Sequence, residues 1–186
     1  MTGSVLTTER LVLRPLRLDD VDALVELDAD PEVMRYLTGG APTPRSDIER
    51  DLPTWLDVRA GVGRLAALVD GRFIGWFALR PPPPGHIIGG LPGDLELGYR
   101  IRRDAWGHGY ATEGGRALVA HGFRTLDVPR IVATTMTVNL ASRRVMEKVG
   151  LRFLSTFHLE WDDPIDGADQ GEVLYGLTRA EFEAPA

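Results

Sequence analysis

The sequence predicts an α/β fold in which helices flank one central mixed sheet. In the second half of the chain, segments with the two-residue period of strands alternate with segments of helical period, which is typical of a mixed α/β sheet. In the first half, Asp70-Gly71 joins two apolar runs and is a strong β-hairpin signal. The 186 residues, 44% of them hydrophobic, suit one core, so we expect a single domain over residues 1–186.

The N-terminal segment is predicted to form a strand followed by a helix. Arg10–Leu16 alternates polar and apolar residues, and Pro15 stops the strand because proline has no amide hydrogen to pair. Asp19 and Asp20 come next, immediately before a run with helical spacing of apolar residues. Their carboxylates predict the N-caps of that helix.

Two more helices are expected before the hairpin. Pro31 begins a short one, in the first-turn position where proline is well tolerated. Ser46-x-x-Glu49 matches a capping box and predicts the start of the other. Pro53 lies inside that helical pattern, so we expect a kink or a restart there.

The rest of the chain is predicted to alternate strands and helices around one long loop. The loop is Pro81–Gly93, which holds five prolines and four glycines and resembles the lids and binding loops of compact domains. The expected strands are Arg64–Val69, Arg72–Leu79, Leu95–Ile101, Arg130–Met136, Leu151–Trp161 and Glu172–Thr178. The expected helices are Tyr110–Arg124 and Asn139–Val149.

Composition argues against several classes of protein. The chain has no cysteine, which excludes thiol catalysis and disulfides, and its four histidines lie far apart, so no metal site is expected. A net charge of −6 argues against nucleic-acid binding. No apolar run approaches the roughly 20 residues of a membrane span, and Met1–Thr8 lacks the features of a signal peptide. We therefore expect a cytoplasmic protein without metal, nucleic-acid or membrane partners.

The segment Gly107-His108-Gly109 between a predicted strand and a predicted helix has the pattern of a phosphate cradle. Glycines let the backbone approach an anion, and the amides at the helix N-terminus point at it. The pattern is too short for a dinucleotide fingerprint, although Gly114 and Gly115 follow. Arg130 also lies in the zone where that motif needs an acidic residue, which argues against a nucleotide-binding protein.

Leu97–Ile101 followed by Trp106–Glu113 closely resembles the acetyl-CoA-binding core of the GNAT acetyltransferases, and in particular of their RimJ/RimL-type branch. Three other segments resemble further motifs of that branch, in order along the chain. They are Thr8–Arg14, Asn139-x-x-Ser142 with Gly150-Leu151 after it, and Leu174–Arg179. The resemblance implies a mixed, mostly antiparallel sheet of six or seven strands, with a splayed strand pair that forms the acyl-CoA cleft.

The resemblance also implies how acetyl-CoA is held. The turn and the helix start would bind the pyrophosphate through backbone amides, the strand before them would bind the pantetheine arm, and Asn139 would both cap its helix and contact the cofactor. His108 would touch a phosphate or face solvent. The residues expected to contact acetyl-CoA are Tyr99, Ile101, Gly107, His108, Gly109, Tyr110, Ala111, Thr112 and Asn139.

The resemblance assigns two candidates for proton transfer. Glu96 would act as the general base, and the alternative is a solvated residue at a strand edge. Ser142 would protonate the departing CoA thiolate, and the alternative is a helix residue that only satisfies backbone groups. His158 and Glu160 are expected on one face of the predicted strand Leu151–Trp161, where some family members bind substrate.

Two positions depart from the family pattern. Asp104 stands where the general motif has Arg or Gln, and Val145-Met146 replaces the tyrosine that many members use as a general acid. The expected activity is transfer of acetyl from acetyl-CoA to a primary amine by direct attack, since no cysteine can carry the acyl group. The alternative is a non-catalytic acyl-CoA-binding or regulatory module.

The sequence does not decide whether the acceptor is a protein N-terminus or a small-molecule amine. An α-amino group, with a pKa near 7.7–8.0, is about one-tenth neutral at pH 7, whereas a lysine side chain is almost fully charged. A site with one carboxylate therefore favours an α-amine or a small aminated metabolite. By analogy with the family, a homodimer is also allowed.

Overall fold

The computed structural model describes residues 6–59, 61–82 and 92–184, and all the strands found there belong to one sheet. Its order is β1-β2-β3-β4-β5-β6-β8-β7. The strands are β1 (Leu6–Thr7), β2 (Val12–Pro15), β3 (Gly63–Val69), β4 (Arg72–Arg80), β5 (Leu95–Ile101), β6 (Arg130–Met136), β7 (Arg152–Phe157) and β8 (Glu172–Thr178). The α-helices are α1 (Val21–Asp28), α2 (Pro31–Thr38), α3 (Arg45–Trp55), α4 (Tyr110–Arg124), α5 (Leu140–Lys148) and α6 (Arg179–Glu183).

The sheet is mixed and mostly antiparallel, as predicted, because among the described strands only the β5–β6 pair is parallel. It has eight strands in place of six or seven, and the additional strand is the two-residue β1. The β3–β4 hairpin turns at Asp70 and Gly71, whose φ angles of 49° and 78° are both positive. Positive φ at both central residues is what a tight two-residue hairpin turn requires.

One predicted helix cap is wrong, and the other has the predicted position without the predicted hydrogen bond. Helix α3 begins at Arg45 after Pro44, so Ser46 lies inside the helix and makes no capping box. Asp20 does not cap α1 with its side chain. Its carboxylate instead pairs with Arg14 at 2.6 Å and accepts the amide of Arg17, which stabilises a short 3₁₀ turn. A nearby cation thus outcompetes the helix amides for the carboxylate.

Helix α3 continues through Pro53 and ends at Trp55, so the expected restart does not occur. Proline has no amide hydrogen for the carbonyl four residues earlier, but Pro53 lies near the end of the helix, where the loss of one bond does not stop it. The described chain also ends in a helix that was not predicted, α6, which Thr178 begins with a capping box to Glu181.

Helices cover both faces of the central strands. Phe77 and Leu79 of β4 face α4, where Gly114 and Gly122 allow close packing. The alternate residues Ala66 and Trp76 face the other way, against a smaller core built from α1 and α3. Alternation along the strands thus gives two cores, the larger beneath α4 and α5 and the smaller beneath α1 and α3.

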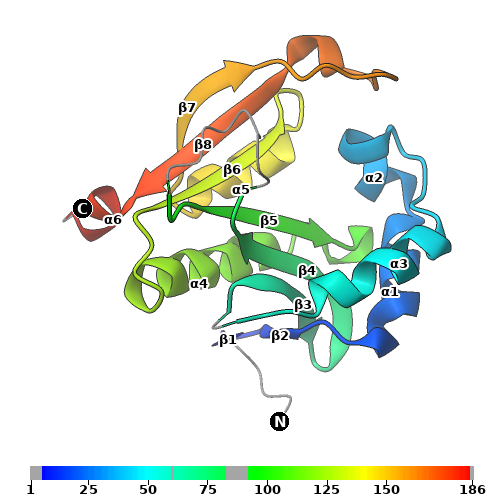
Figure 1. Ribbon diagram of the computed structural model, residues 1–186, viewed down its shortest axis with the longest axis horizontal. Coiled ribbons are helices and arrows are strands. Elements are labelled where there is room, and N and C mark those ends of the chain that lie inside the picture. The colour runs from blue at the N-terminus through cyan, green and yellow to red at the C-terminus, as the bar shows by residue number, and fades with distance from the viewer. Residues whose placement is uncertain (1–5, 60, 83–91, 185–186) are drawn as a thin grey trace.

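The sheet opens between β5 and β6. These strands pair only through Leu95 with Ile131 and Glu96 with Val132, after which they diverge. Figure 1 shows β6, β8 and β7 rising away from β5 on the far side of this opening. The splayed strand pair expected from the sequence is therefore confirmed.

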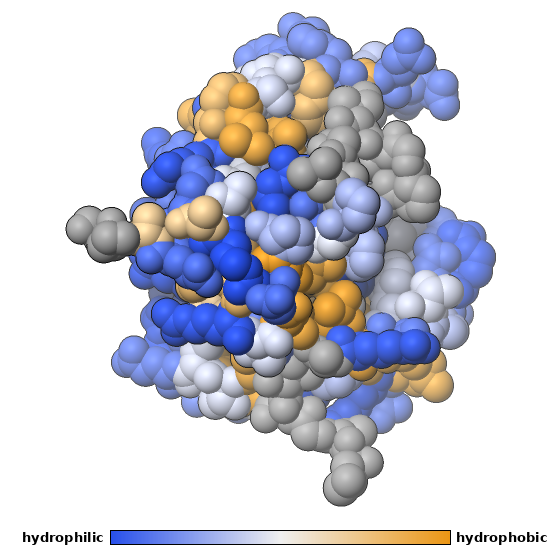
Figure 2. Space-filling view, turned by 60° about the vertical axis from the view of Figure 1, so that its left-hand side comes forward, coloured by the Kyte–Doolittle hydropathy of each residue, from blue (hydrophilic) through white to orange (hydrophobic). Residues whose placement is uncertain are grey.

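Strand β7 is shorter than predicted and forms an edge of the sheet. It ends at Phe157, so His158 and Glu160 lie beyond it and do not share a strand face. Phe153 and Leu154 are 53% and 47% exposed on this edge. Figure 2 shows, on the side of the molecule turned forward, apolar patches set in a mostly hydrophilic surface.

Most of the predicted loop Pro81–Gly93 lies outside the described residues, because residues 83–91 are not described. In the part of the chain that is described, no helix is long and apolar enough to cross a membrane.

Gly114→Ala should destabilise the fold although alanine favours helices. A Cβ at position 114 would lie 2.4 Å from Cζ of Phe77, a clash in the tightly packed contact between α4 and β4. We expect a loss of about 1–3 kcal/mol in the free energy of unfolding, measured by urea denaturation. The double variant Gly114→Ala, Phe77→Leu should lose less stability than the sum of the two single losses. Strict additivity would contradict this packing.

Candidate active site

The turn before α4 presents its backbone amides as an anion cradle. Gly107 and Gly109 have φ angles of 78° and 82°, a conformation that glycine adopts without strain. Gly109 is the N-cap of α4 and offers no side chain to the first-turn amides of Tyr110, Ala111 and Thr112. Those amides have no carbonyl partner within the helix and lie at the positive end of its dipole. The predicted phosphate site therefore has suitable backbone geometry.

The side chain of Glu113 ties this turn to the N-terminal strand region. Its Oε1 accepts the Thr8 hydroxyl at 2.6 Å and the Arg10 amide at 2.9 Å, while Oε2 accepts Nε of Arg10 at 2.7 Å. Arg10 also donates to the carbonyl of His108 at 2.9 Å and stacks over the Tyr110 ring, 4.8 Å from its centre. The cradle is thus held by residues about a hundred positions earlier in the sequence.

This network shifts the ionisation of Glu113. Partial burial alone would raise the pKa of Glu113, but the hydrogen bonds from Thr8 and Arg10 outweigh it and lower that pKa below its ordinary value of 4.5. Glu113 lies within the segment that resembles the family motif, but the sequence pattern indicates no role for it. Its partners are too distant in sequence for spacing to reveal them.

An open groove of about 800 Å³ lies beside the cradle. Gly109 and Thr112 line it from the start of α4, and Arg10, Arg116 and Lys148 add three positive side chains. Arg116 also donates to the carbonyl of Lys148 at 2.9 Å, which joins α4 to the end of α5. The groove combines free amides with cations and suits a polyanionic ligand.

At the splay, Tyr99 of β5 meets Ser142 of α5. The Tyr99 hydroxyl lies 2.9 Å from Oγ of Ser142 and donates to the Ser142 carbonyl at 3.1 Å. Burial raises the pKa of Tyr99 to about 12, although the hydrogen bond to Ser142 opposes the shift. Tyr99 is therefore a neutral proton donor at physiological pH.

Asn139 fixes the start of α5 as predicted. Its Oδ1 accepts the Ser142 amide at 3.2 Å, and its Nδ2 donates to Oγ1 of Thr135 in β6 at 3.0 Å. The cap therefore anchors α5 to β6 and holds Ser142 against Tyr99.

Glu96 lies on the other face of β5, at the last position where β5 and β6 pair. Its side chain is only 12% exposed, and Oε2 accepts from Arg80 at 3.1 Å. This placement is not that of a freely solvated edge residue. Oε1 has no partner among the bonds of the described residues.

The remaining predicted positions have varied surroundings. Ile101 is 6% exposed and belongs to the core, so only its backbone is available to a ligand. Nδ1 of His108 lies 2.8 Å from the carbonyl of Trp106, and its ring stacks on Tyr110. Asp104, at the position that departs from the family, pairs with Arg72 and Arg102. Met146, which replaces the usual tyrosine, is a buried core residue.

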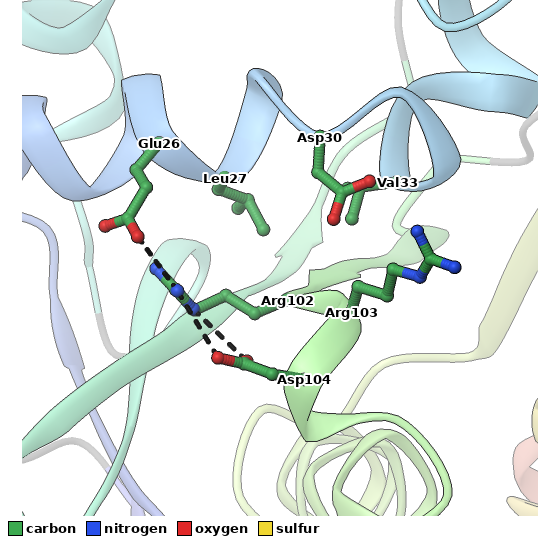
Figure 3. A pocket seen from close by; sticks show the side chains of 7 residues that line it. All are labelled: Glu26, Leu27, Asp30, Val33, Arg102, Arg103 and Asp104. Carbon is green, nitrogen blue, oxygen red and sulfur yellow. Dashed lines mark hydrogen bonds and ion pairs between the residues drawn. The ribbon is translucent and has the colours of Figure 1, made fainter.

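A second hollow, of about 510 Å³, lies between the α1–α2 region and the segment after β5. Figure 3 shows Arg102 between Glu26 and Asp104, to which it is ion-paired, while Arg103 and Asp30 stand opposite them. The charges of Glu26, Arg102 and Asp104 are thus paired with one another. Within the described residues, no three Asp, Glu or His side chains gather as a metal-binding group.

Comparison with known proteins agrees with this geometry. A family model described as an acetyltransferase (GNAT) domain matches residues 10–152. An FsC-acetyl coenzyme A-N(2)-transacetylase of Aspergillus fumigatus is 37% identical over 182 residues, which cover 95% of this chain and 77% of that protein.

Two solved structures show the same fold. One is RimL, a ribosomal L7/L12 α-N-protein acetyltransferase in complex with coenzyme A, with a TM-score of 0.76 at 17% identity over 95% of this chain and 98% of that one. The other is Mycobacterium smegmatis RimJ in complex with a CoA-disulfide, with a TM-score of 0.70 at 24% identity over 94% and 84% of the two chains.

The chain belongs to the GNAT family of acetyltransferases, whose fold and splayed strands it shares. It is an N-acetyltransferase, the activity for which its relatives are named.

Glu113→Gln should destabilise the protein at pH 7 by roughly 1–3 kcal/mol, because it weakens charge-assisted hydrogen bonds to Thr8 and Arg10. The folded-state pKa of Glu113 is lowered, so its contribution is present above the unfolded value near 4.5 and is lost as the pH falls further. Urea unfolding at several pH values should show the variant and wild type converging as the pH falls below 4.5 and through the lowered folded-state pKa.

The exposed neighbour Glu9 provides the control, and Glu9→Gln should leave stability nearly unchanged at every pH. A gap between Glu113→Gln and wild type that persists in acid would contradict the assigned role of the carboxylate.

Proposed function

We propose that the protein transfers acetyl from acetyl-CoA to a primary amine. The pyrophosphate binds the amides of Gly109–Thr112, and the positive side chains of the adjoining groove assist it. The pantetheine arm lies between β5 and β6, where the backbone of Tyr99 and Ile101 is unpaired on the β6 side. One domain over residues 1–186, a cytoplasmic location and a homodimer remain predictions.

One observation carries the proposal. The end of the β5–β6 pairing has Glu96 on one face of the sheet and the Tyr99–Ser142 pair on the other, beside the anion cradle. A thioester inserted at this point would meet the Glu96 carboxylate on one face and the Tyr99–Ser142 hydroxyl pair on the other, where its sulfur would lie. This is the arrangement that direct acyl transfer needs.

In the proposed reaction, Glu96 accepts the proton of the attacking amine, directly or through a water. The nitrogen attacks the thioester carbonyl, and a backbone amide of β5 stabilises the negative oxygen. When the carbon–sulfur bond breaks, the Ser142 hydroxyl donates its proton to the thiolate sulfur. Tyr99 passes its own proton to Ser142 in the same step and takes one back from solvent as CoA leaves. The neutral Tyr99 thus supplies the proton that the missing α5 tyrosine would otherwise provide.

The acceptor is proposed to be a small molecule with a defined amine. The Aspergillus fumigatus relative is named for acetyl coenzyme A as donor and an N(2) nitrogen as acceptor. An acceptor of this kind also agrees with the ionisation argument, because an α-amine is partly neutral at pH 7. Protein N-termini are the alternative, since RimL acts on a ribosomal protein and has the same fold.

A matched pair at Gly109 tests the anion cradle. Asn and Asp both tolerate the left-handed backbone at this position, but only Asp adds a negative charge. We expect Gly109→Asp to bind acetyl-CoA roughly 10- to 100-fold more weakly than Gly109→Asn in isothermal titration calorimetry. Equal affinities for the two variants would place the pyrophosphate elsewhere.

Acetyl transfer should depend on Glu96, Ser142 and Tyr99. CoA release from acetyl-CoA is followed with a thiol reagent, since the chain has no cysteine, against peptides, amino acids and polyamines as acceptors. We expect Glu96→Gln to lower kcat about 10²–10⁴-fold, with smaller losses for Ser142→Ala and Tyr99→Phe.

Wild-type binding of acetyl-CoA without release to any acceptor would favour the acyl-CoA-binding module. Full activity of Glu96→Gln would remove Glu96 as the base. Loss of activity in Ser142→Ala but not in Tyr99→Phe would confine the acid role to Ser142.

A further inference from the structure

The face of β5 that carries Glu96 also carries Gly98 and Arg100, because alternate residues of a strand share a face. Arg100 pairs with Asp28 of α1, so this is the side covered by the N-terminal helices. If Glu96 is the base, the acceptor amine must approach from here. The inference below therefore rests on the proposed function.

Arg64 of β3 stands on this same face, between two tryptophans. Its guanidinium lies 4.0 Å from the centre of the Trp55 ring and 4.7 Å from that of Trp76. Among the described residues, it forms no ion pair and no side-chain hydrogen bond. The two indole faces hold the group in place but leave its N–H donors unused.

The neighbouring arginines differ from Arg64 in this respect. Arg80 pairs with Glu96 and Arg100 with Asp28, so each has a carboxylate of its own. Arg64 is the excess positive charge of the cluster.

Burial and the nearby Arg80 and Arg100 lower the pKa of Arg64 to about 10, which still leaves it charged at neutral pH. The carboxylates of Asp28 and Asp51 oppose this shift but do not outweigh it, so an anionic ligand would further stabilise the partly buried guanidinium.

Small residues and the ring of Trp76 lie between Arg64 and β5. Arg64 is paired with Ala78 of β4, and Ala78 is paired with Gly98 of β5, so small residues fill the row across the strands. Two strand spacings separate β3 from β5, roughly 10 Å. Cζ3 of Trp76 lies 3.8 Å from where a Cβ of Gly98 would stand, so a ligand that reaches from Glu96 to Arg64 would pass along the Trp76 ring.

We propose that Arg64 binds a carboxylate of the acceptor, which makes the acceptor class a primary amine with a carboxylate several bonds away. The unused planar edge of a guanidinium between two rings matches a planar carboxylate, which accepts two parallel N–H bonds. Arg64 acts in recognition and takes no part in proton transfer.

The test compares 6-aminohexanoate with 6-aminohexanamide, two primary amines that differ only at the distant group. In wild type, we expect the KM for the carboxylate to be roughly 10- to 100-fold lower than for the amide. In Arg64→Gln this difference should vanish with the KM for acetyl-CoA unchanged. Arg124→Gln removes another aromatic-stacked arginine, far along α4, and should keep the preference.

A second readout does not require turnover. Trp55 and Trp76 flank Arg64, so their fluorescence should change when the carboxylate binds in the absence of acetyl-CoA, and change little with the amide or in Arg64→Gln. A saturable change in fluorescence with the carboxylate, but no acetyl transfer to it, would support the Arg64 site and overturn the proposed reaction. Acetyl transfer with equal KM values for the two probes, and equal fluorescence responses, would overturn the Arg64 site and leave the reaction standing.

Discussion

The short pairing between β5 and β6 is the constraint on which the site depends. Two residue pairs join these strands, and beyond them the backbone of β5 has hydrogen-bonding groups without a strand partner on that side. Unpaired backbone groups inside a fold are costly, so a site of this kind needs an extended ligand or water to satisfy them. The pantetheine arm of CoA carries amides that can do so. Closing the sheet would satisfy the strands but remove the space in which a thioester can lie.

Much of the fold could be predicted because its signals are local. Asp70-Gly71 defines a turn by its own backbone preferences, and the bounds of β5, α4, β6 and β8 follow their periodicity. The failures came where a polar contact or the end of strand pairing changed a local preference. Asp20 binds Arg14 in place of the α1 amides, and β7 leaves the sheet at Phe157 although its apolar pattern continues.

The candidate site was predicted unevenly for the same reason. The resemblance and the glycine pattern located the cradle, Asn139 and Ser142, and the structure places Ser142 beside Tyr99. The phenol of Tyr99 was expected to contribute only through its strand, because the hydrogen bond crosses from β5 to α5. Arg64 had no distinguishing pattern in the sequence. Its unpaired charge becomes visible only once Trp55, Trp76 and the paired arginines around it are in place.

The bonds of Glu113 have a thermodynamic consequence for the whole N-terminal segment. The carboxylate of Glu113 binds Thr8 and Arg10, and Glu113 directly follows the cradle amides of Tyr110, Ala111 and Thr112. Docking of the N-terminal segment and binding of an anion in the cradle therefore depend on the same residue. Linkage is reciprocal. If docking of the segment raises the affinity for the cofactor, bound cofactor stabilises the docked segment by the same free energy. The segment between β1 and β2 is in this sense an internal effector, and loosening it should weaken CoA binding in addition to lowering the stability of the fold.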